Sequence, residues 1–186
     1  MAQFSLFQTS LGPCGIAWAG GRVIATSLPE ACAADTRRRL AGRSGGSEQP
    51  APPAIARVID AMTALLAGQR TDLTFVDCDL SGIDPFAVRV YGAARGIPAG
   101  RTATYGEIAE GLWDRRLARN VGQALGRNPL PIIVPCHRVL GADGKLVGFS
   151  AEGGVALKLK MLDIEGAQPG GVPGLFDDLP LAVKPA

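Results

Sequence analysis

The spacing of apolar residues changes along this chain from strand-like to helical, and this change constrains the fold more than any other feature. Residues 3–28 contain three short runs typical of strands, the last two separated by the turn signal Gly20-Gly21. Residues 30–41 and 54–67 have helical spacing, with a proline-rich loop at 42–53 between them and a strand expected at DLTFVD after them. The first 80 residues therefore predict a small α/β domain.

Beyond residue 81 the apolar spacing is helical almost throughout. A helix is expected in DPFAVRVYGAARGI, and Thr104 with Glu107 forms a capping-box pattern that opens a second helix. Asp114 is placed to cap a third helix, which runs to Gly126. Two short capped helices separated by a few residues are typical of a helix-turn-helix. The pattern predicts a second, mainly helical domain over residues 81–168.

The end of this second domain has a distinct pattern. Prolines after Asn128 end the helix, and a short strand, IIV, follows them. The stretch VLGADGKLVGF has an Asp-Gly turn between apolar arms and predicts a hairpin that forms a wing. A last helix is expected at GGVALKLKMLDIEG, with Val155, Leu159 and Leu162 facing inward. Residues 169–186, rich in proline, predict a loosely held C-terminal extension.

Charge and composition exclude several classes of protein. Apolar residues make up 47% of the 186 residues and charged residues 19%, so a packed globular protein is expected. Seven arginines and three acidic residues lie between Arg95 and Arg138, whereas the whole chain carries only +2. Positive charge is thus concentrated around the paired helices. No run is apolar enough to span a membrane and no signal peptide is recognised, so a cytoplasmic protein is expected.

The cysteines disfavour both a disulfide framework and a metal site. The chain has four of them without a CxxC spacing, and a single histidine, His137. No GxGxxG or P-loop pattern is present, so no nucleotide cofactor is expected either. The prediction is a protein without metal or cofactor.

The only histidine follows Cys136 directly, between Pro135 and Arg138. A thiol becomes a useful nucleophile when a neighbouring base takes its proton, so this pair is a candidate catalytic site. The alternative is a buried structural cysteine beside a surface histidine. In that case the capping box only caps a helix, and the arginines only form a solvated face. The residues alone leave catalysis and this structural interpretation open.

Three stretches of the chain resemble the O6-alkylguanine-DNA alkyltransferases. They are FAVRVYGAARGIPAGRTATYGEIA, ARNVGQALGRNPLPIIVPCHRV and VGFSAEGG with the following IEG, and together they span roughly residues 81–166. The resemblance implies an α+β fold: a small ribonuclease H-like α/β domain, and a mainly helical domain with a winged helix-turn-helix. It also implies a DNA repair protein that flips O6-alkylguanine out of duplex DNA and transfers the alkyl group irreversibly to its own cysteine.

Each functional residue of that family has a matching position here. The resemblance implies that Cys136 accepts the alkyl group, that His137 takes the thiol proton through a water, and that Glu165 holds the imidazole. Tyr105 would donate toward the leaving guanine and help the nucleotide to turn out. The implied DNA-binding residues are Tyr105, Arg119, Gly122 and Asn128, and the implied pocket residues are Arg138, Val139, Phe149 and Ser150.

One departure from the family pattern concerns the loop that closes over the base. Ala151-Glu152 is an insertion there, and Glu152 either repels phosphate or points to solvent. The expected partner is double-stranded DNA carrying O6-alkylguanine, bound by a monomer. Two rival hypotheses are a non-catalytic alkyltransferase-like module that only binds lesions, and a cysteine hydrolase. The acceptor cysteine disfavours the first, and the lack of an evident oxyanion device disfavours the second.

Overall fold

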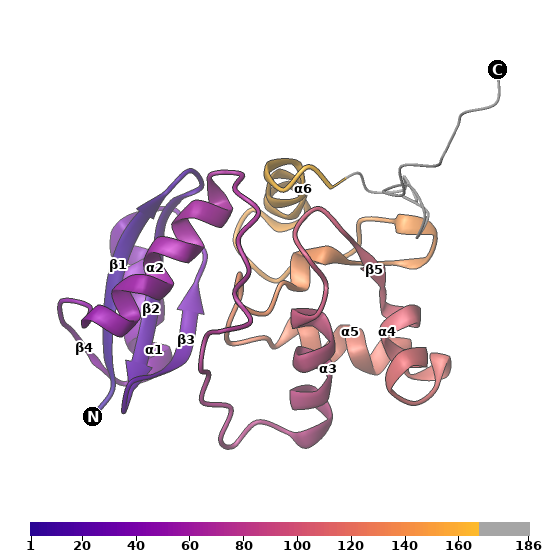
Figure 1. Cartoon of the computed structure of the whole chain (residues 1–186), viewed down its shortest axis with the longest axis horizontal. Helices are drawn as coiled ribbons and strands as arrows, with labels where there is room; N and C mark the ends of the chain where they lie inside the picture. The colour runs from indigo at the N-terminus through magenta and orange to yellow at the C-terminus, as the bar shows by residue number, and fades with distance from the viewer. Residues whose placement is uncertain (168–186) are drawn as a thin grey trace.

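The computed structural model describes residues 1–167, and it shows a four-stranded sheet beside a group of short helices (Figure 1). The sheet has the strand order β3-β2-β1-β4, with β1 to β3 antiparallel and β4 parallel to β1. Its elements are β1 (Gln3–Thr9), β2 (Gly12–Ala19), β3 (Arg22–Ser27), α1 (Ala33–Ser44), β4 (Ser47–Glu48) and α2 (Pro53–Leu66).

The two faces of this sheet are covered by different helices, because successive strand residues point to opposite sides. Ala17 packs with Leu40 of α1 on one face, whereas Ile16 belongs to the main core, which also contains Ile55 and Met62 of α2. The predicted strands and both helices of this half are confirmed. The strand expected at DLTFVD is wrong: residues 74 and 75 form a turn, and the isolated bridge to the sheet, between Val23 and Cys78, lies directly after this stretch.

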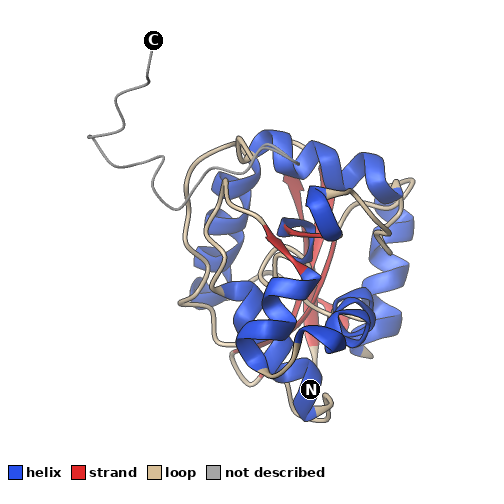
Figure 2. Ribbon diagram, turned by 90° about the vertical axis from the view of Figure 1, so that its right-hand side faces the viewer, coloured by secondary structure: helices blue, strands red, loops and turns tan. Residues whose placement is uncertain are grey.

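The second half consists of helices and 3₁₀ turns linked by short strands (Figures 1 and 2). Tyr91 ties two of the helices together, because its buried hydroxyl donates to the carbonyl of Ala124 at 3.0 Å. The elements are α3 (Pro85–Arg95), β5 (Ala103–Thr104), α4 (Tyr105–Leu112), η1 (Arg115–Leu117), α5 (Ala118–Gly126), η2 (Cys136–Arg138), β6 (Val139–Leu140), η3 (Ala142–Gly144) and α6 (Gly154–Ile164).

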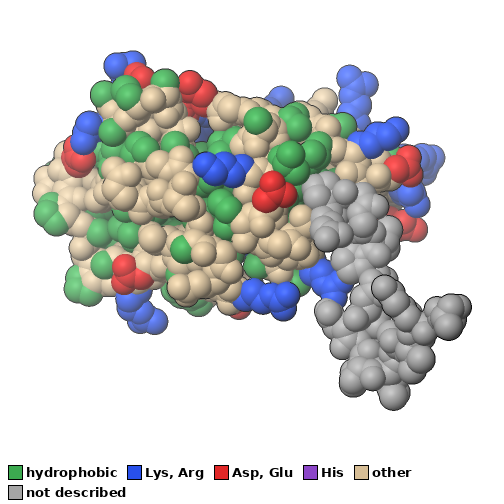
Figure 3. Space-filling view, turned by 90° about the horizontal axis from the view of Figure 1, so that it is seen from above, with side chains coloured by type: hydrophobic (Ala, Val, Ile, Leu, Met, Phe, Trp, Pro, Cys, Tyr) green, Lys and Arg blue, Asp and Glu red, His purple; other side chains and the backbone are tan. Residues whose placement is uncertain are grey.

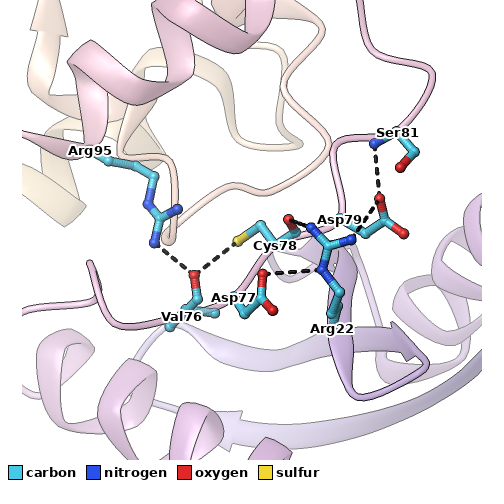
Figure 4. A network of polar contacts seen from close by, with 7 residues as sticks. All are labelled: Arg22, Val76, Asp77, Cys78, Asp79, Ser81 and Arg95. Atoms are coloured by element: carbon cyan, nitrogen blue, oxygen red, sulfur yellow. Dashed lines mark hydrogen bonds and ion pairs between the residues drawn. The ribbon is translucent and has the colours of Figure 1, made fainter.

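Polar contacts join the two halves beside a continuous apolar core. Arg22 of β3 pairs with Asp77 at 3.1 Å and Asp79 at 3.6 Å, while Arg95 of α3 donates to the carbonyl of Val76 at 2.9 Å (Figure 4). The main core contains side chains from β2 through α6. The segment between α2 and α3 is therefore held from both sides.

Two of the strand predictions for the second half are wrong. The stretch IIV forms no strand, because the turn it belongs to makes only one bridge, between Pro131 and Val134. The hairpin is replaced by the turn η3, in which Asp143 has φ 57° and the amide of Gly141 donates to the carbonyl of Lys145 at 2.8 Å. Within residues 1–167, β6 pairs only with β5. The extension predicted at 169–186 lies outside the described residues.

No helix in the described part of the chain has the length and apolar character needed to cross a bilayer. On the face seen in Figure 3, Lys and Arg side chains are scattered among Asp and Glu side chains, and several of both kinds gather at the right-hand end. This distribution agrees with the mild net charge of +2.

Candidate functional site

The turn before Cys136 is fixed by hydrogen bonds from both sides. The buried side chain of Asn128 donates to the carbonyl of Val134 and accepts from the amide of Leu130, both at 2.9 Å. Thr26 of β3 binds the turn from the sheet: its amide donates to the Pro129 carbonyl at 3.0 Å and its hydroxyl to the Pro131 carbonyl at 2.7 Å.

Ile132 lies inside this turn at φ 78°, a conformation that costs a β-branched residue about 1–3 kcal/mol. The contacts from Asn128 and Thr26 stabilise this strained backbone. They also position the chain at Pro135, directly before the cysteine.

Cys136 begins the 3₁₀ helix η2 and lines a pocket of about 30 Å³, which is large enough for one or two water molecules. One wall comes from the N-terminal half, and another from the loop that contains Phe149, Ser150 and Ala151. Burial raises the pKa of the Cys136 thiol, although Asn128 and the charge of Lys158 oppose this shift. The resting group is therefore a thiol, which needs a base before it can act as a nucleophile.

His137 is buried and held by Glu165. Its Nε2 lies 2.9 Å from Oε1 of Glu165, and both side chains are 1% exposed. Burial lowers the pKa of His137, so the imidazole is neutral at pH 7 and Nε2–H donates to the carboxylate. The other nitrogen, Nδ1, is buried without a hydrogen-bond partner among the described residues, and its lone pair is free to accept a proton.

Arg138 balances the negative charge of Glu165. Its Nε and one Nη donate to the two carboxylate oxygens, each at 2.8 Å, and another Nη donates to the carbonyl of Ile97. Burial raises the pKa of Glu165, but the hydrogen bonds and charges of His137 and Arg138 outweigh it and bring the pKa to about 2. Glu165 is thus ionised throughout the physiological pH range.

Lys158 belongs to the same site and was missed in the sequence. It is completely buried, and its Nζ donates to the Val139 carbonyl at 2.7 Å and to the Val147 carbonyl at 3.4 Å. The same atom lies 5.9 Å from the centre of the Tyr105 ring. Burial lowers the pKa of Lys158, whereas the nearby Cys136 raises it.

The face of α6 was predicted incorrectly, and this explains why Lys158 was missed. Val155 and Leu159 are 40% and 38% exposed, and only Leu162 of the three predicted residues is buried. The helix instead directs Lys158 and Met161 inward. The sequence around Lys158 did not indicate that this lysine is buried.

Tyr105 lies at the first position of α4, after the predicted capping box of Thr104 and Glu107, which is confirmed. It is half-buried, and burial raises the pKa of its hydroxyl. A Cβ at Gly122 of α5 would lie 3.7 Å from the Tyr105 ring, an ordinary van der Waals distance, so the packing of the two helices would also accommodate alanine here. Arg119 is exposed near the start of α5.

The sequence and structure agree with one protein family. The family model described as the 6-O-methylguanine DNA methyltransferase, DNA binding domain, matches residues 85–167. The chain is 44% identical over 128 residues to the methylated-DNA–protein-cysteine methyltransferase of Mycobacterium tuberculosis (strain ATCC 25618 / H37Rv), which covers 69% of this chain and 75% of the relative. This chain belongs to that methyltransferase family.

Two further comparisons extend the family assignment. The DNA base-flipping protein of Thermus thermophilus is 41% identical over 111 residues, 60% of this chain and 73% of that protein. The crystal structure of Mycobacterium tuberculosis OGT in complex with DNA has a TM-score of 0.73 at 34% identity, covering 88% of this chain and 92% of that one. The mixed α+β fold is therefore that of the OGT structures.

The structure brings most of the residues implied by the family together. Asn128, Phe149 and Ser150 line the pocket with Cys136, while His137 and Glu165 lie buried beside it. Two predicted pocket residues, Arg138 and Val139, do not line this pocket.

Arg138 lines a separate cavity, behind the turn that carries Cys136. Val139 is fully buried, its amide donating to the Cys136 carbonyl and its own carbonyl accepting from Lys158. Neither side chain is among those that line the Cys136 pocket.

Glu152, where the sequence predicts an insertion, lies close enough to Glu30 of the N-terminal half to affect its pKa. Burial raises the pKa of Glu30, and a hydrogen bond with Glu152 raises it further, while the charge of Arg39 opposes both. Arg39 Nε lies 3.1 Å from Glu30 Oε1. Glu30 and the residues Phe149 to Ala151 line the same pocket, so this loop lies against the N-terminal half.

Proposed function

We propose that this protein repairs alkylated DNA by moving the alkyl group of O6-alkylguanine onto Cys136, once per molecule. One observation carries the assignment to these residues: a pocket thiol directly precedes a buried, neutral imidazole whose Nδ1 is free and whose Nε2 is held by an ionised Glu165. This is the arrangement of nucleophile, base and orienting carboxylate that cysteine chemistry requires.

The proton of the thiol is the first barrier. Nδ1 of His137 accepts it, directly or through one water, and the positive charge that forms on the ring is stabilised by Glu165 at Nε2. Arg138 keeps Glu165 ionised, so the carboxylate does not remove the proton from the ring. The ammonium of Lys158 stabilises the thiolate, since its charge lowers the pKa of Cys136.

The transfer itself is an in-line substitution. The sulfur forms a bond to the alkyl carbon while the bond from that carbon to O6 breaks, and the electron pair stays on the guanine. In this proposal Tyr105 donates a proton toward this leaving group. The product is a thioether, which has no easy leaving group, so the thiol is not regenerated.

DNA is the partner in this proposal, with the alkylated guanine flipped out of the duplex. Flipping costs a few kcal/mol, and Arg119 on the exposed side of α5 fills the vacated position. The helices α4 and α5 form the helix-turn-helix, and the turn around η3 takes the place of the wing. A guanine is larger than the pocket of about 30 Å³, so the loop at Phe149–Ala151 moves to admit it.

The finer architecture belongs to the same proposal. Residues 1–80 form a supporting ribonuclease H-like domain, which the mixed sheet with β4 parallel to β1 supports. Residues 81–168 form the alkyltransferase domain and 169–186 an extension. The protein acts as a cytoplasmic monomer on double-stranded DNA.

A transfer assay with two matched cysteine variants tests the proposal. Cys136→Ala and Cys32→Ala are each mixed with duplex DNA that carries an O6-methylguanine radiolabelled in its methyl group. Cys32 serves as the control because it is also a free cysteine and is exposed. We expect label on the wild-type protein and on Cys32→Ala, and none on Cys136→Ala, with lesion binding retained in all three. Label retained by Cys136→Ala would contradict the assignment. Tight lesion binding by the wild type without any label would favour the non-catalytic module.

A further inference from the structure

The pocket of Cys136 has one wall that comes from the N-terminal half of the chain and is charged. Glu30 lies shortly after β3, and Arg39 and Arg43 belong to α1. The alkyl-transfer proposal uses the cysteine, its base and the loop at 149–151, but it gives this wall no role. A methyl group has no polar atom for charged side chains to bind. The wall therefore suits a substrate whose alkyl group is larger and polar.

The close packing of α1 on the sheet holds this wall in place. Leu40 of α1 is completely buried and packs with Ala17 of β2. A Cβ at Gly15 of β2 would lie only 2.6 Å from a methyl carbon of Leu40, so the helix approaches the strand as closely as a glycine allows. When the loop at 149–151 moves to admit a base, α1 keeps Arg39 and Arg43 where they are.

The two arginines of the wall differ in their partners. Nε of Arg39 lies 3.1 Å from Oε1 of Glu30, whose side chain is only 12% exposed. Arg43 makes no ion pair with any acid of residues 1–167. Burial and the charge of Arg39 lower the pKa of Arg43, and the charge of Glu30 opposes them only in part. Arg43 is thus a partly desolvated cation that no described carboxylate contacts.

The position of Arg43 in its helix explains only part of this arrangement. Arg43 lies in the last turn of α1, where the helix dipole stabilises a positive charge. The dipole does not require the side chain to line the pocket of Cys136, as it does here. Arg38 of the same helix gives the contrast, because it is 78% exposed, pairs with Asp35 and does not line that pocket.

We propose that Arg43 binds a carboxylate at the end of the alkyl group, so that the protein accepts O6-carboxymethylguanine as well as O6-methylguanine. This inference rests on the proposed alkyl transfer and names a substrate class for it. The sulfur of Cys136 forms a bond to the methylene carbon while the bond from that carbon to O6 breaks, and the electron pair stays on the guanine. Cys136 becomes S-carboxymethylcysteine, and the proton of the thiol ends on the released guanine.

The carboxymethyl group needs a cation beside it for an electrostatic reason. Its carboxylate lies one bond from the reacting carbon, so the approaching thiolate repels it. The guanidinium of Arg43 offsets this repulsion with charge-assisted hydrogen bonds. A methyl group makes neither contact. Arg43 therefore determines which alkyl group is accepted and takes no part in the transfer of a methyl group.

Transfer from two lesions in otherwise identical duplexes tests the inference. Single-turnover rate constants for the carboxymethyl and the methyl group are measured for the wild type, Arg43→Gln, Arg43→Lys and the control Arg38→Gln. We expect Arg43→Gln to slow carboxymethyl transfer about fivefold and methyl transfer less than about twofold. Arg43→Lys should keep most of the carboxymethyl rate, and Arg38→Gln should change neither rate.

The two lesions separate a failure of this inference from a failure of the proposed function. Methyl transfer without carboxymethyl transfer in the wild type would overturn the inference and leave the proposed function intact. Equal losses for both lesions in Arg43→Gln would do the same. Transfer from neither lesion would contradict the proposed function itself.

Two small reagents test the same contact without DNA. Iodoacetate and iodoacetamide both alkylate thiols, and only iodoacetate carries a carboxylate. The ratio of their rates at Cys136, followed by mass spectrometry of the peptide that contains it, should fall about fivefold in Arg43→Gln and stay unchanged in Arg38→Gln. An unchanged ratio in Arg43→Gln would overturn the inference, whatever the DNA assay shows.

Discussion

Replacing Glu165 by Gln tests the charge balance at the centre of the site. The substitution keeps the size of the side chain and an oxygen for Nε2–H of His137, but it removes the only negative charge that contacts Arg138 among the described residues. The side chain of Arg138 is only 7% exposed, so its charge is left without compensation in the interior. We therefore expect a large loss of stability and slower alkyl transfer.

The size of the loss follows from two independent estimates. Breaking a buried ion pair by removing one partner costs about 3–5 kcal/mol. The pKa of Glu165, lowered from 4.5 to about 2, corresponds to about 3 kcal/mol of stability at neutral pH. Because the folded-state pKa is the lower one, this stability is present above pH 4.5 and is lost as the pH falls toward 2.

Urea unfolding from pH 7 down to pH 3 measures the effect. We expect Glu165→Gln to unfold about 3 kcal/mol more easily than the wild type at pH 7, with the gap narrowing below pH 4.5. Asp163→Asn, an exposed acid two residues away, is the control and should cost under about 0.5 kcal/mol. A loss below about 1 kcal/mol, or a gap that does not depend on pH, would refute the reasoning.

Three further predictions concern other parts of the site. Lys158→Met should raise the pKa of Cys136 further, seen as a shift to higher pH in the rate of thiol alkylation by iodoacetamide; an unchanged profile would remove Lys158 from the proposed thiolate stabilisation. Asn128→Ala leaves the buried Leu130 amide unpaired and removes one of the two hydrogen bonds to the Val134 carbonyl, so it should cost about 1–3 kcal/mol in urea unfolding, whereas a loss near zero would mean that the turn is held without it. Arg119→Ala should slow repair of duplex DNA far more than reaction with the free base O6-methylguanine, and equal losses would contradict its role in flipping.

The parts of the fold that depend on local sequence were predicted well. The capping box of Thr104 and Glu107 and the turn at Gly20-Gly21 are each fixed by residues a few positions apart, and both are found. The hairpin after Val139 was wrong because an Asp-Gly pair also suits a 3₁₀ turn. Asp143 adopts that turn, with a positive φ.

The catalytic site could be predicted only in part. The adjacency of Cys136 and His137 was visible in the sequence, but Glu165 lies 28 residues away and was assigned through the family resemblance alone. Lys158 was missed because a buried ammonium depends on two carbonyls that the fold brings to it, those of Val139 and Val147. Contacts made by tertiary structure leave no periodic signal in the sequence.

The contact between Glu152 and Glu30 is a third case of this kind. An insertion was predicted at Ala151-Glu152, with two alternatives for the direction of Glu152. The structure places it against a carboxyl group 122 positions earlier in the chain, on the opposite wall of the pocket. Nothing in the local sequence of the loop indicates this partner.

Mass spectrometry of the protein after reaction with duplex DNA that carries a single O6-methylguanine tests the central claim most directly. We expect one added methyl group per protein, located on the peptide that contains Cys136 and saturating at that level with excess DNA. A methyl group on Cys14, Cys32 or Cys78 would contradict the assignment of the acceptor. An unchanged mass for folded, reduced protein would contradict alkyl transfer itself.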